Sequence, residues 1–200
     1  MKRIGLTGGI ASGKSWVASQ LRELNIRVLD ADLLGHRLME PGAAAYDEVI
    51  REFGREILRE DNSIDRKKLG AIVFADPKKL AKLNSILHPR IEEAINAQFE
   101  KWQAEGITDP VFVEAALLVE AGMHKRLDGL VVVWCRPEDQ IARLLARGLS
   151  EQEARSRIAL QMPNGEKLKF ATYKIDTSGT MQYTQEQVAA LAKSLRTAER

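Results

Sequence analysis

Short runs of apolar residues recur along the chain and are separated by stretches with helical spacing. Apolar runs without polar alternation are typical of strands that are covered on both faces, as in a parallel sheet. Because strands and helices follow one another in turn, the pattern predicts an α/β fold in which a five-stranded parallel sheet is flanked by helices. The predicted strands are Ile4–Leu6, Ile26–Leu29, Val111–Val113, Leu130–Trp134 and Tyr173–Ile175.

The interval between Asp30 and Val111 contains no convincing strand and has the spacing of helices. A simple crossover between two strands does not need that length. We therefore predict a helical insertion over residues 33–105, in a core formed by residues 1–32 and 106–200. Such an insertion is a natural place for a second substrate.

Local signals predict where helices begin and end. Asp76 followed by Pro77 predicts a helix start, and Pro89 predicts the start of the next helix, which runs to about Gln103. Two capping-box patterns, at residues 150–153 and 184–187, predict further helices, the last over residues 185–196. The Pro-Asn-Gly sequence at 163–165 is expected to end the helix before it.

Composition narrows the class of protein. The 200 residues carry 30 Lys and Arg against 28 Asp and Glu, so the net charge is +2, which argues against a dedicated nucleic-acid binder. One cysteine cannot form an internal disulfide, and no apolar run approaches the roughly 18 residues of a membrane helix. We expect a cytoplasmic protein, a monomer or small homo-oligomer, with small-molecule substrates and neither nucleic-acid nor membrane partners.

The strongest motif follows the first predicted strand and reads G-x-x-x-x-G-K-S, the phosphate-binding loop or P-loop. Its backbone N–H groups and the following helix N-terminus favour phosphate, Lys14 reaches the β- and γ-phosphates, and the Ser15 hydroxyl binds Mg²⁺. The motif predicts that ATP and Mg²⁺ are bound. The predicted nucleotide contacts are Gly8, Gly9, Ile10, Ala11, Ser12, Gly13, Lys14, Ser15 and the adjoining Trp16.

Two acids follow the second predicted strand. Asp30 and Asp32 point the same way if the chain stays extended, and strand ends face the ligand crevice in such sheets. One of them is a candidate to position or deprotonate an attacking hydroxyl or to hold Mg²⁺. The alternative, that Asp32 only caps a helix that begins at Leu33, is equally compatible with the spacing.

Several segments together resemble the dephospho-coenzyme A (CoA) kinases. They are Leu6–Ser15, Val28–Asp32, His88-Pro89, Leu117–Glu120, Ser150–Met162 and Ala171–Gly179, which occur in the order of that family and span most of the chain. The resemblance implies transfer of phosphate from ATP to the ribose 3′-hydroxyl of dephospho-CoA, giving CoA and ADP, the last step of CoA synthesis. It also implies that residues 33–105 bind CoA and that residues 136–169 form a lid.

The resemblance assigns roles to individual residues. Asp32 matches the acid proposed in the family to take the proton from the 3′-hydroxyl, and Asp30, His88, Glu114 and Leu117 lie in segments expected to line the acceptor site. Glu114 stands where the family often has Asp, and it is a candidate to contact substrate, or Mg²⁺ through water. From the sequence alone, an isolated histidine before a helix is more often structural than functional.

Arginines gather in the expected lid. Arg143 and Arg147 are four residues apart, so they share a face of the predicted helix. Phosphoryl transfer leaves negative charge on the transferred group, which a closing arginine stabilises. Arg147, which matches a lid arginine of the family, is the first candidate for this catalytic role, and Arg143 is a candidate nucleotide contact; pairing with nearby acids is the alternative for each.

The P-loop departs from the family pattern at Ala11, where Gly is usual, and at Trp16, where Thr is usual. We expect the backbone angle at position 11 to be one that alanine tolerates. The indole of Trp16 cannot offer the hydroxyl of threonine to a phosphate. Two alternatives to the family reaction therefore remain open at this stage: a kinase of the nucleoside monophosphate type, and a nucleotide-binding regulator with vestigial activity.

Overall fold

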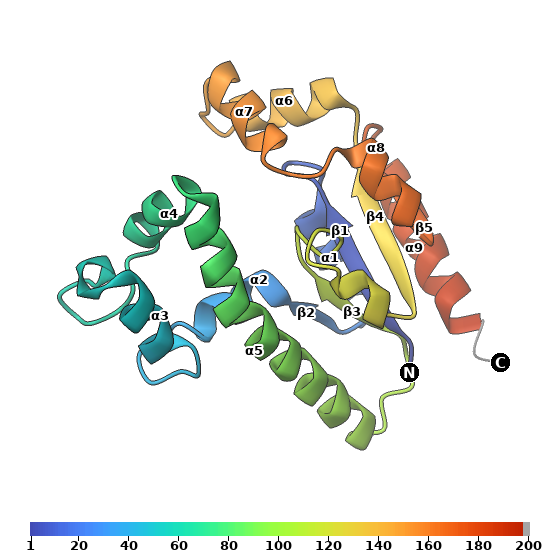
Figure 1. Ribbon diagram of the computed structural model, residues 1–200. Coiled ribbons are helices and arrows are strands. Elements are labelled where there is room, and N and C mark those ends of the chain that lie inside the picture. Colours follow the sequence, from blue (N-terminus) through green and yellow to red (C-terminus); the bar gives the residue numbers. More distant parts are fainter. Residues whose placement is uncertain (198–200) are drawn as a thin grey trace. The chain divides into compact units, whose positions relative to one another are not determined.

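The computed structural model describes residues 1–197 and divides into two compact units. The first unit consists of Met1–Asp30 and Gly106–Arg200, and the second of Ala31–Glu105. Figure 1 shows the first unit as the sheet with its helices and the second as a group of helices. We describe each unit by itself.

The first unit is built on a five-stranded sheet in the order β2-β3-β1-β4-β5. All of the strand pairs are parallel, as the apolar runs predict. The strands are β1 (Arg3–Gly8), β2 (Val28–Asp30), β3 (Val111–Glu114), β4 (Gly129–Trp134) and β5 (Tyr173–Asp176). The central strand β1 leads into the P-loop, so the loop emerges at the edge of the sheet where the carboxyl ends of the parallel strands meet.

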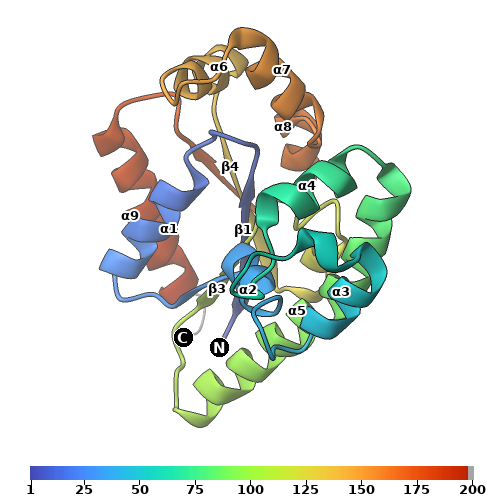
Figure 2. The ribbon, with the colours of Figure 1, turned by 90° about the vertical axis from the view of Figure 1, so that its left-hand side faces the viewer.

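Helices α1 (Lys14–Glu23) and α9 (Met181–Thr197) pack side by side on one face of the sheet (Figure 2). Leu6 and Val133 of the sheet form one core with Val17 and Leu21 of α1 and Leu191 of α9. Burying each such side chain contributes about 1.5–3 kcal/mol, so this core fixes the start of α1, and with it the end of the P-loop. Leu118, Leu127 and Leu130 line the opposite face beside Gly5.

The segment of residues 136–169 follows β4 and carries α6 (Pro137–Leu145), α7 (Glu151–Ala159) and α8 (Asn164–Lys167), with the short helix η3 (Leu168–Phe170) at its end. Ser150 and Glu153 form the predicted capping box. The prediction that the Pro-Asn-Gly sequence at 163–165 ends the preceding helix is wrong. Helix α7 already ends at Ala159, and Pro163 is instead the N-cap residue of α8.

Two predictions about helices in this unit are wrong. Because α6 ends at Leu145, Arg147 lies in the turn after the helix and not on it with Arg143. The last helix begins at Met181 and not after a cap at Thr184; the Thr184 hydroxyl donates back to the carbonyl of Thr180, the residue before the helix, at 3.2 Å.

The second unit is helical and contains α2 (Ala31–Arg37), α3 (Tyr46–Phe53), the short η1 (Arg55–Ile57), α4 (Arg66–Phe74) and α5 (Pro77–Ala104). Asp65 and Asp76 accept backbone hydrogen bonds at the starts of α4 and α5, so the predicted cap at Asp76 is confirmed. Buried side chains such as Val49, Phe53 and Ile86 form its core.

Pro89 does not start a helix but lies inside α5. A proline in a helix interior removes a hydrogen bond and costs about 3 kcal/mol. Leu83, Ile86 and Leu87 before it and Ile91 after it all belong to the core of the second unit, and their burial offsets that cost. The helix therefore continues through Pro89 because packing outweighs the local signal.

Among residues 1–197, no helix is long and apolar enough to cross a membrane.

Candidate active site

The P-loop joins the end of β1 at Gly8 to the start of α1 at Lys14. Gly13, which caps α1, has φ 89°, a left-handed conformation that favours glycine. In the described residues 1–197, no protein group accepts a hydrogen bond from the amides of Gly13, Lys14 and Ser15. Three such amides at a helix N-terminus form a site for an anion such as phosphate.

The Lys14 side chain is held by a carboxylate. Its Nζ lies 2.8 Å from Oε1 of Glu114, and Arg22 lies 3.4 Å from the other oxygen, Oε2. The side chains of Lys14 and Glu114 are 13% and 4% exposed, whereas that of Arg22 is 44% exposed. Asp30 is paired in register with Glu114 at the end of the sheet, so the two acids terminate neighbouring strands.

A cavity of about 250 Å³ opens beside the P-loop. Its lining comes from the P-loop, α1, α6 and the turn after it, the turn after β5, and the start of α9. The lining residues are Ala11, Gly13, Trp16, Arg143, Arg147, Thr177, Gly179, Met181 and Thr184. Trp16 is half-buried and packs against the core of the sheet while it lines the cavity. The candidate arginines and Trp16 thus meet at one cavity, although Arg147 reaches it from a turn.

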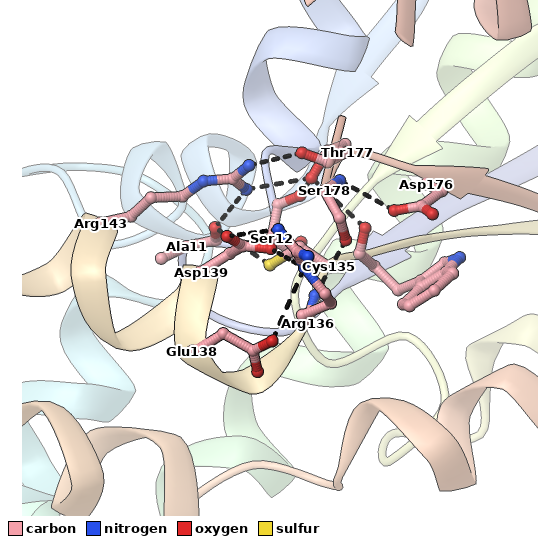
Figure 3. Close-up of polar contacts among 11 residues, drawn as sticks. Ala11, Ser12, Cys135, Arg136, Glu138, Asp139, Arg143, Asp176, Thr177 and Ser178 are labelled. Carbon is pink, nitrogen blue, oxygen red and sulfur yellow. Dashed lines mark hydrogen bonds and ion pairs between the residues drawn. The ribbon is translucent and has the colours of Figure 1, made fainter. Parts of the chain in front are cut away.

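Arg143 connects the P-loop to the turn after β5 (Figure 3). Its Nη1 donates to the carbonyl of Ala11 at 3.1 Å and to the hydroxyl of Thr177 at 3.0 Å, and its Nη2 donates to the Thr177 carbonyl at 2.5 Å. Thr177 Oγ1 in turn donates to the Ser12 carbonyl at 2.7 Å. Arg143 therefore holds the two backbone segments that border the cavity.

Ala11 departs from the expectation for its backbone. Its φ is 58°, in the left-handed region, which costs a non-glycine residue roughly 1–2 kcal/mol. The methyl group is buried and packs with Leu144 of α6 and Ala154 of α7. The conformation is thus not one that alanine adopts without cost, and packing against the 136–169 segment offsets part of that cost.

Cys135 is buried close to the Ala11 carbonyl, with Sγ at 3.9 Å. Burial raises the pKa of this thiol above its usual value. The side chain is therefore a packing residue of the core and not a nucleophile.

Sequence reasoning did not find a group of polar side chains in the 136–169 segment. Gln140, Gln161 and Asn164 lie against the first part of the P-loop, and Gln140 is 5% exposed. Lys167 is fully buried and donates to the Ala116 carbonyl at 2.6 Å and pairs with Glu120 at 3.0 Å. Glutamine is a common surface residue, so its type alone carries no signal for such a role.

The remaining predicted residues divide between the units. Leu117 belongs to the first unit and is 45% exposed. Asp32 and His88 belong to the second unit. The alternative interpretation, that Asp32 only caps a helix starting at Leu33, is wrong, since α2 begins at Ala31 and Asp32 lies in its first turn. His88 is half-buried in α5, and burial lowers its pKa.

A parallel sheet with a P-loop after its central strand, arginines at the adjoining cavity and a separate helical unit define the class of P-loop small-molecule kinases. The dephospho-CoA kinase family model matches residues 2–183. The dephospho-CoA kinase of Bacillus anthracis is 43% identical over 191 residues, 95% of each chain. That of Aquifex aeolicus is 45% identical over 196 residues, 98% of each chain. The chain belongs to the dephospho-CoA kinase family.

The structure of the chain is also similar to a solved structure from this family. The dephospho-CoA kinase from Campylobacter jejuni superposes with a TM-score of 0.74 at 26% identity, over 99% of this chain and 98% of that one. The sheet and its flanking helices are therefore shared with a member of the same family.

Proposed function

We propose that this protein transfers the γ-phosphoryl group of ATP to the ribose 3′-hydroxyl of dephospho-CoA, giving CoA and ADP. The observation that carries the proposal is the family match over residues 2–183, which includes an intact Gly13-Lys14-Ser15 at the start of α1. The free amides at this helix start and the Lys14 ammonium supply the positive field that phosphoryl transfer needs.

The residues of the first unit fit a nucleotide with Mg²⁺. Among residues 1–197, no group of three or more His, Cys, Asp or Glu could hold a metal alone. Mg²⁺ usually takes few protein ligands and relies on substrate phosphates and water. The Ser15 hydroxyl would be its protein ligand here, with Glu114 or Asp30 acting through water. Bound there, Mg²⁺ would neutralise charge on the phosphates.

Charge that develops on the transferred group calls for a further cation. Arg147 lines the cavity beside the P-loop from a turn, a backbone position that can move more easily than a helix. Arg143 already bonds to the Ala11 and Thr177 backbone, so we assign it the task of shaping the nucleotide site. Arg147 is the better candidate to contact the transferred phosphoryl group.

The acceptor side of the reaction is assigned to the second unit, residues 31–105. Asp32 would take the proton from the 3′-hydroxyl as general base, and His88, whose lowered pKa keeps it neutral at pH 7, would line the CoA site without adding charge. Residues 136–169 would act as a lid that excludes water during transfer.

An acceptor panel tests the reaction. The protein is incubated with ATP and Mg²⁺ and with dephospho-CoA, AMP, CMP or buffer alone. Formation of CoA only from dephospho-CoA is the expected result. Transfer to AMP or CMP instead would indicate a nucleoside monophosphate kinase, and ATP binding without transfer to any acceptor would indicate a regulator.

The variant Asp32→Asn tests the general base. It should bind ATP as tightly as the unchanged protein and lose about 10²–10⁴-fold in turnover, the usual contribution of a general base. The ATP dissociation constant and kcat are measured on the same preparation. An unchanged kcat would remove Asp32 from this role.

A further inference from the structure

Two glutamine side chains of the 136–169 segment hold the backbone of the P-loop at Ile10, and an asparagine supports one of them. The Ile10 N–H donates to Oε1 of Gln161 at 2.7 Å, and the Ile10 carbonyl accepts from Nε2 of Gln140 at 2.6 Å. Asn164 joins the group by donating to Oε1 of Gln140 at 3.3 Å. We call Gln140, Gln161 and Asn164 the amide clamp.

The backbone fixes the polarity of the clamp. An N–H group can only donate and a carbonyl can only accept, so Gln161 must present its oxygen to Ile10 and Gln140 must present its nitrogen. These roles hold however the amide O and N atoms are assigned. The two glutamines therefore have opposite roles on one residue of the loop.

Gly9 is the residue that lets the clamp approach. A Cβ at position 9 would lie 2.7 Å from Oδ1 of Asn164 and 2.9 Å from Nε2 of Gln140, closer than real contacts allow. Gly9 occupies a variable position of the G-x-x-x-x-G-K-S motif, and its lack of a side chain leaves room for the clamp amides where they are. The Ile10 amide is bonded to Gln161, so it is not available to an anion, unlike the amides of Gly13, Lys14 and Ser15.

We propose that Gln140 and Gln161 are positioning residues that hold the first half of the P-loop in its binding conformation before ATP arrives. Pre-ordering a loop removes an ordering cost from binding, so the clamp raises ATP affinity without touching the nucleotide. Because α6 and the α7–α8 connection both supply clamp residues, movement of the 136–169 segment changes the shape of the P-loop. The inference rests on the proposed function only in requiring that the loop binds ATP.

Two isosteric variants test the polarity. Gln161→Glu keeps an oxygen acceptor for the Ile10 N–H, whereas Gln140→Glu replaces the donor by a second acceptor that faces the Ile10 carbonyl. Both add one negative charge close to the same residue, so each controls for the charge of the other. We expect the ATP dissociation constant of Gln140→Glu to exceed that of Gln161→Glu by at least about fivefold, the value of one net hydrogen bond.

Gln161→Leu supplies a neutral comparison, and it should weaken ATP binding about fivefold. At high salt, which screens the added charge, Gln161→Glu should bind ATP within about twofold of the unchanged protein. The comparison of Gln161→Leu with Gln161→Glu tests the role of Gln161 even if Gln140→Glu fails to fold. Affinity is measured by calorimetry without an acceptor, with circular dichroism as the test of folding.

Equal weakening by the two glutamate variants at high salt, or unchanged ATP binding by Gln161→Leu, would overturn the proposal. A merely structural role would lower the unfolding midpoint of Gln161→Leu and leave its ATP affinity unchanged once folded. Failure of the unchanged protein to phosphorylate dephospho-CoA would refute the proposed reaction and leave this result standing, because ATP binding is measured separately.

Discussion

The ion pair between Lys14 and Glu114 allows a stability prediction that can be worked from the structure. At 2.8 Å and an effective dielectric constant of about 20, the direct attraction is roughly 6 kcal/mol before the cost of removing both groups from water. Removing one partner of a buried pair typically costs about 3–5 kcal/mol. Since Lys14 is 13% exposed, we expect a coupling free energy at or just below the lower end of that range, about 2–3 kcal/mol.

A double-mutant cycle measures this coupling. The variants Lys14→Met, Glu114→Gln and their combination are unfolded with urea without nucleotide. Each single variant leaves a buried charge without its main partner, so the combination should be more stable than the sum of the two effects predicts. Lys14→Met should be the milder single change, because Glu114 keeps Arg22 at 3.4 Å.

The matched control is a second double-mutant cycle, in which Arg22, the other cation that contacts Glu114, is changed in place of Lys14. Arg22 is 44% exposed and its contact with Glu114 is longer, so the cycle of Arg22→Gln with Glu114→Gln should give less than about 1 kcal/mol. Additive effects of Lys14→Met and Glu114→Gln, within about 0.5 kcal/mol, would refute the reasoning. So would equal coupling in the two cycles, because burial would then not decide the strength.

Two further predictions concern Trp16 and His88. Trp16→Thr should tighten ATP binding relative to the unchanged protein, as measured by calorimetry. Trp16→Val is the control, because valine has the shape of threonine without its hydroxyl. Equal ATP affinities of the two variants would exclude the threonine hydroxyl as the cause. Burial lowers the pKa of His88 below 6.5, so the unfolded state takes up a proton first as the pH falls through about 6.5, and the folded state loses stability from there to its lower pKa. His88→Gln should therefore lose less unfolding free energy than the unchanged protein between about pH 7.5 and about pH 5.5, and an equal loss would contradict the assigned cause.

The sheet was predictable because the strands of a parallel sheet are buried on both faces and appear as plain apolar runs. The observed strands overlap all of the predicted ones, although β2 begins at Val28 and not at Ile26. The P-loop was predictable because few sequences outside phosphate sites combine its glycines with Lys14 and Ser15 at the required spacing. These features are local, and local sequence determines them.

Errors arose where contacts distant in the chain outweigh a local signal. Pro89 is an ordinary helix-start residue by its sequence, yet core packing on both sides carries α5 through it. Thr184 has the spacing of a capping box, yet it lies within a helix that starts at Met181, and its hydroxyl donates back to the Thr180 carbonyl. A local helix propensity contributes from a few tenths of a kcal/mol to about 3 kcal/mol, which is less than the free energy gained by burying several large side chains.

The altered P-loop motif is compatible with binding because the loop is not shaped by its own residues alone. Ala11 takes a left-handed backbone at a cost of roughly 1–2 kcal/mol, and its methyl group packs against α6 and α7 while Arg143 binds its carbonyl. The neighbouring Ile10 is bonded on both backbone groups by glutamines that lie 151 and 130 residues away in the chain. A glycine at position 11 would adopt the same backbone freely, but it would give up the methyl contact with the 136–169 segment. The substitution therefore exchanges backbone freedom for a stronger attachment of the loop to that segment, which is why the motif alone underestimates how well the loop is held.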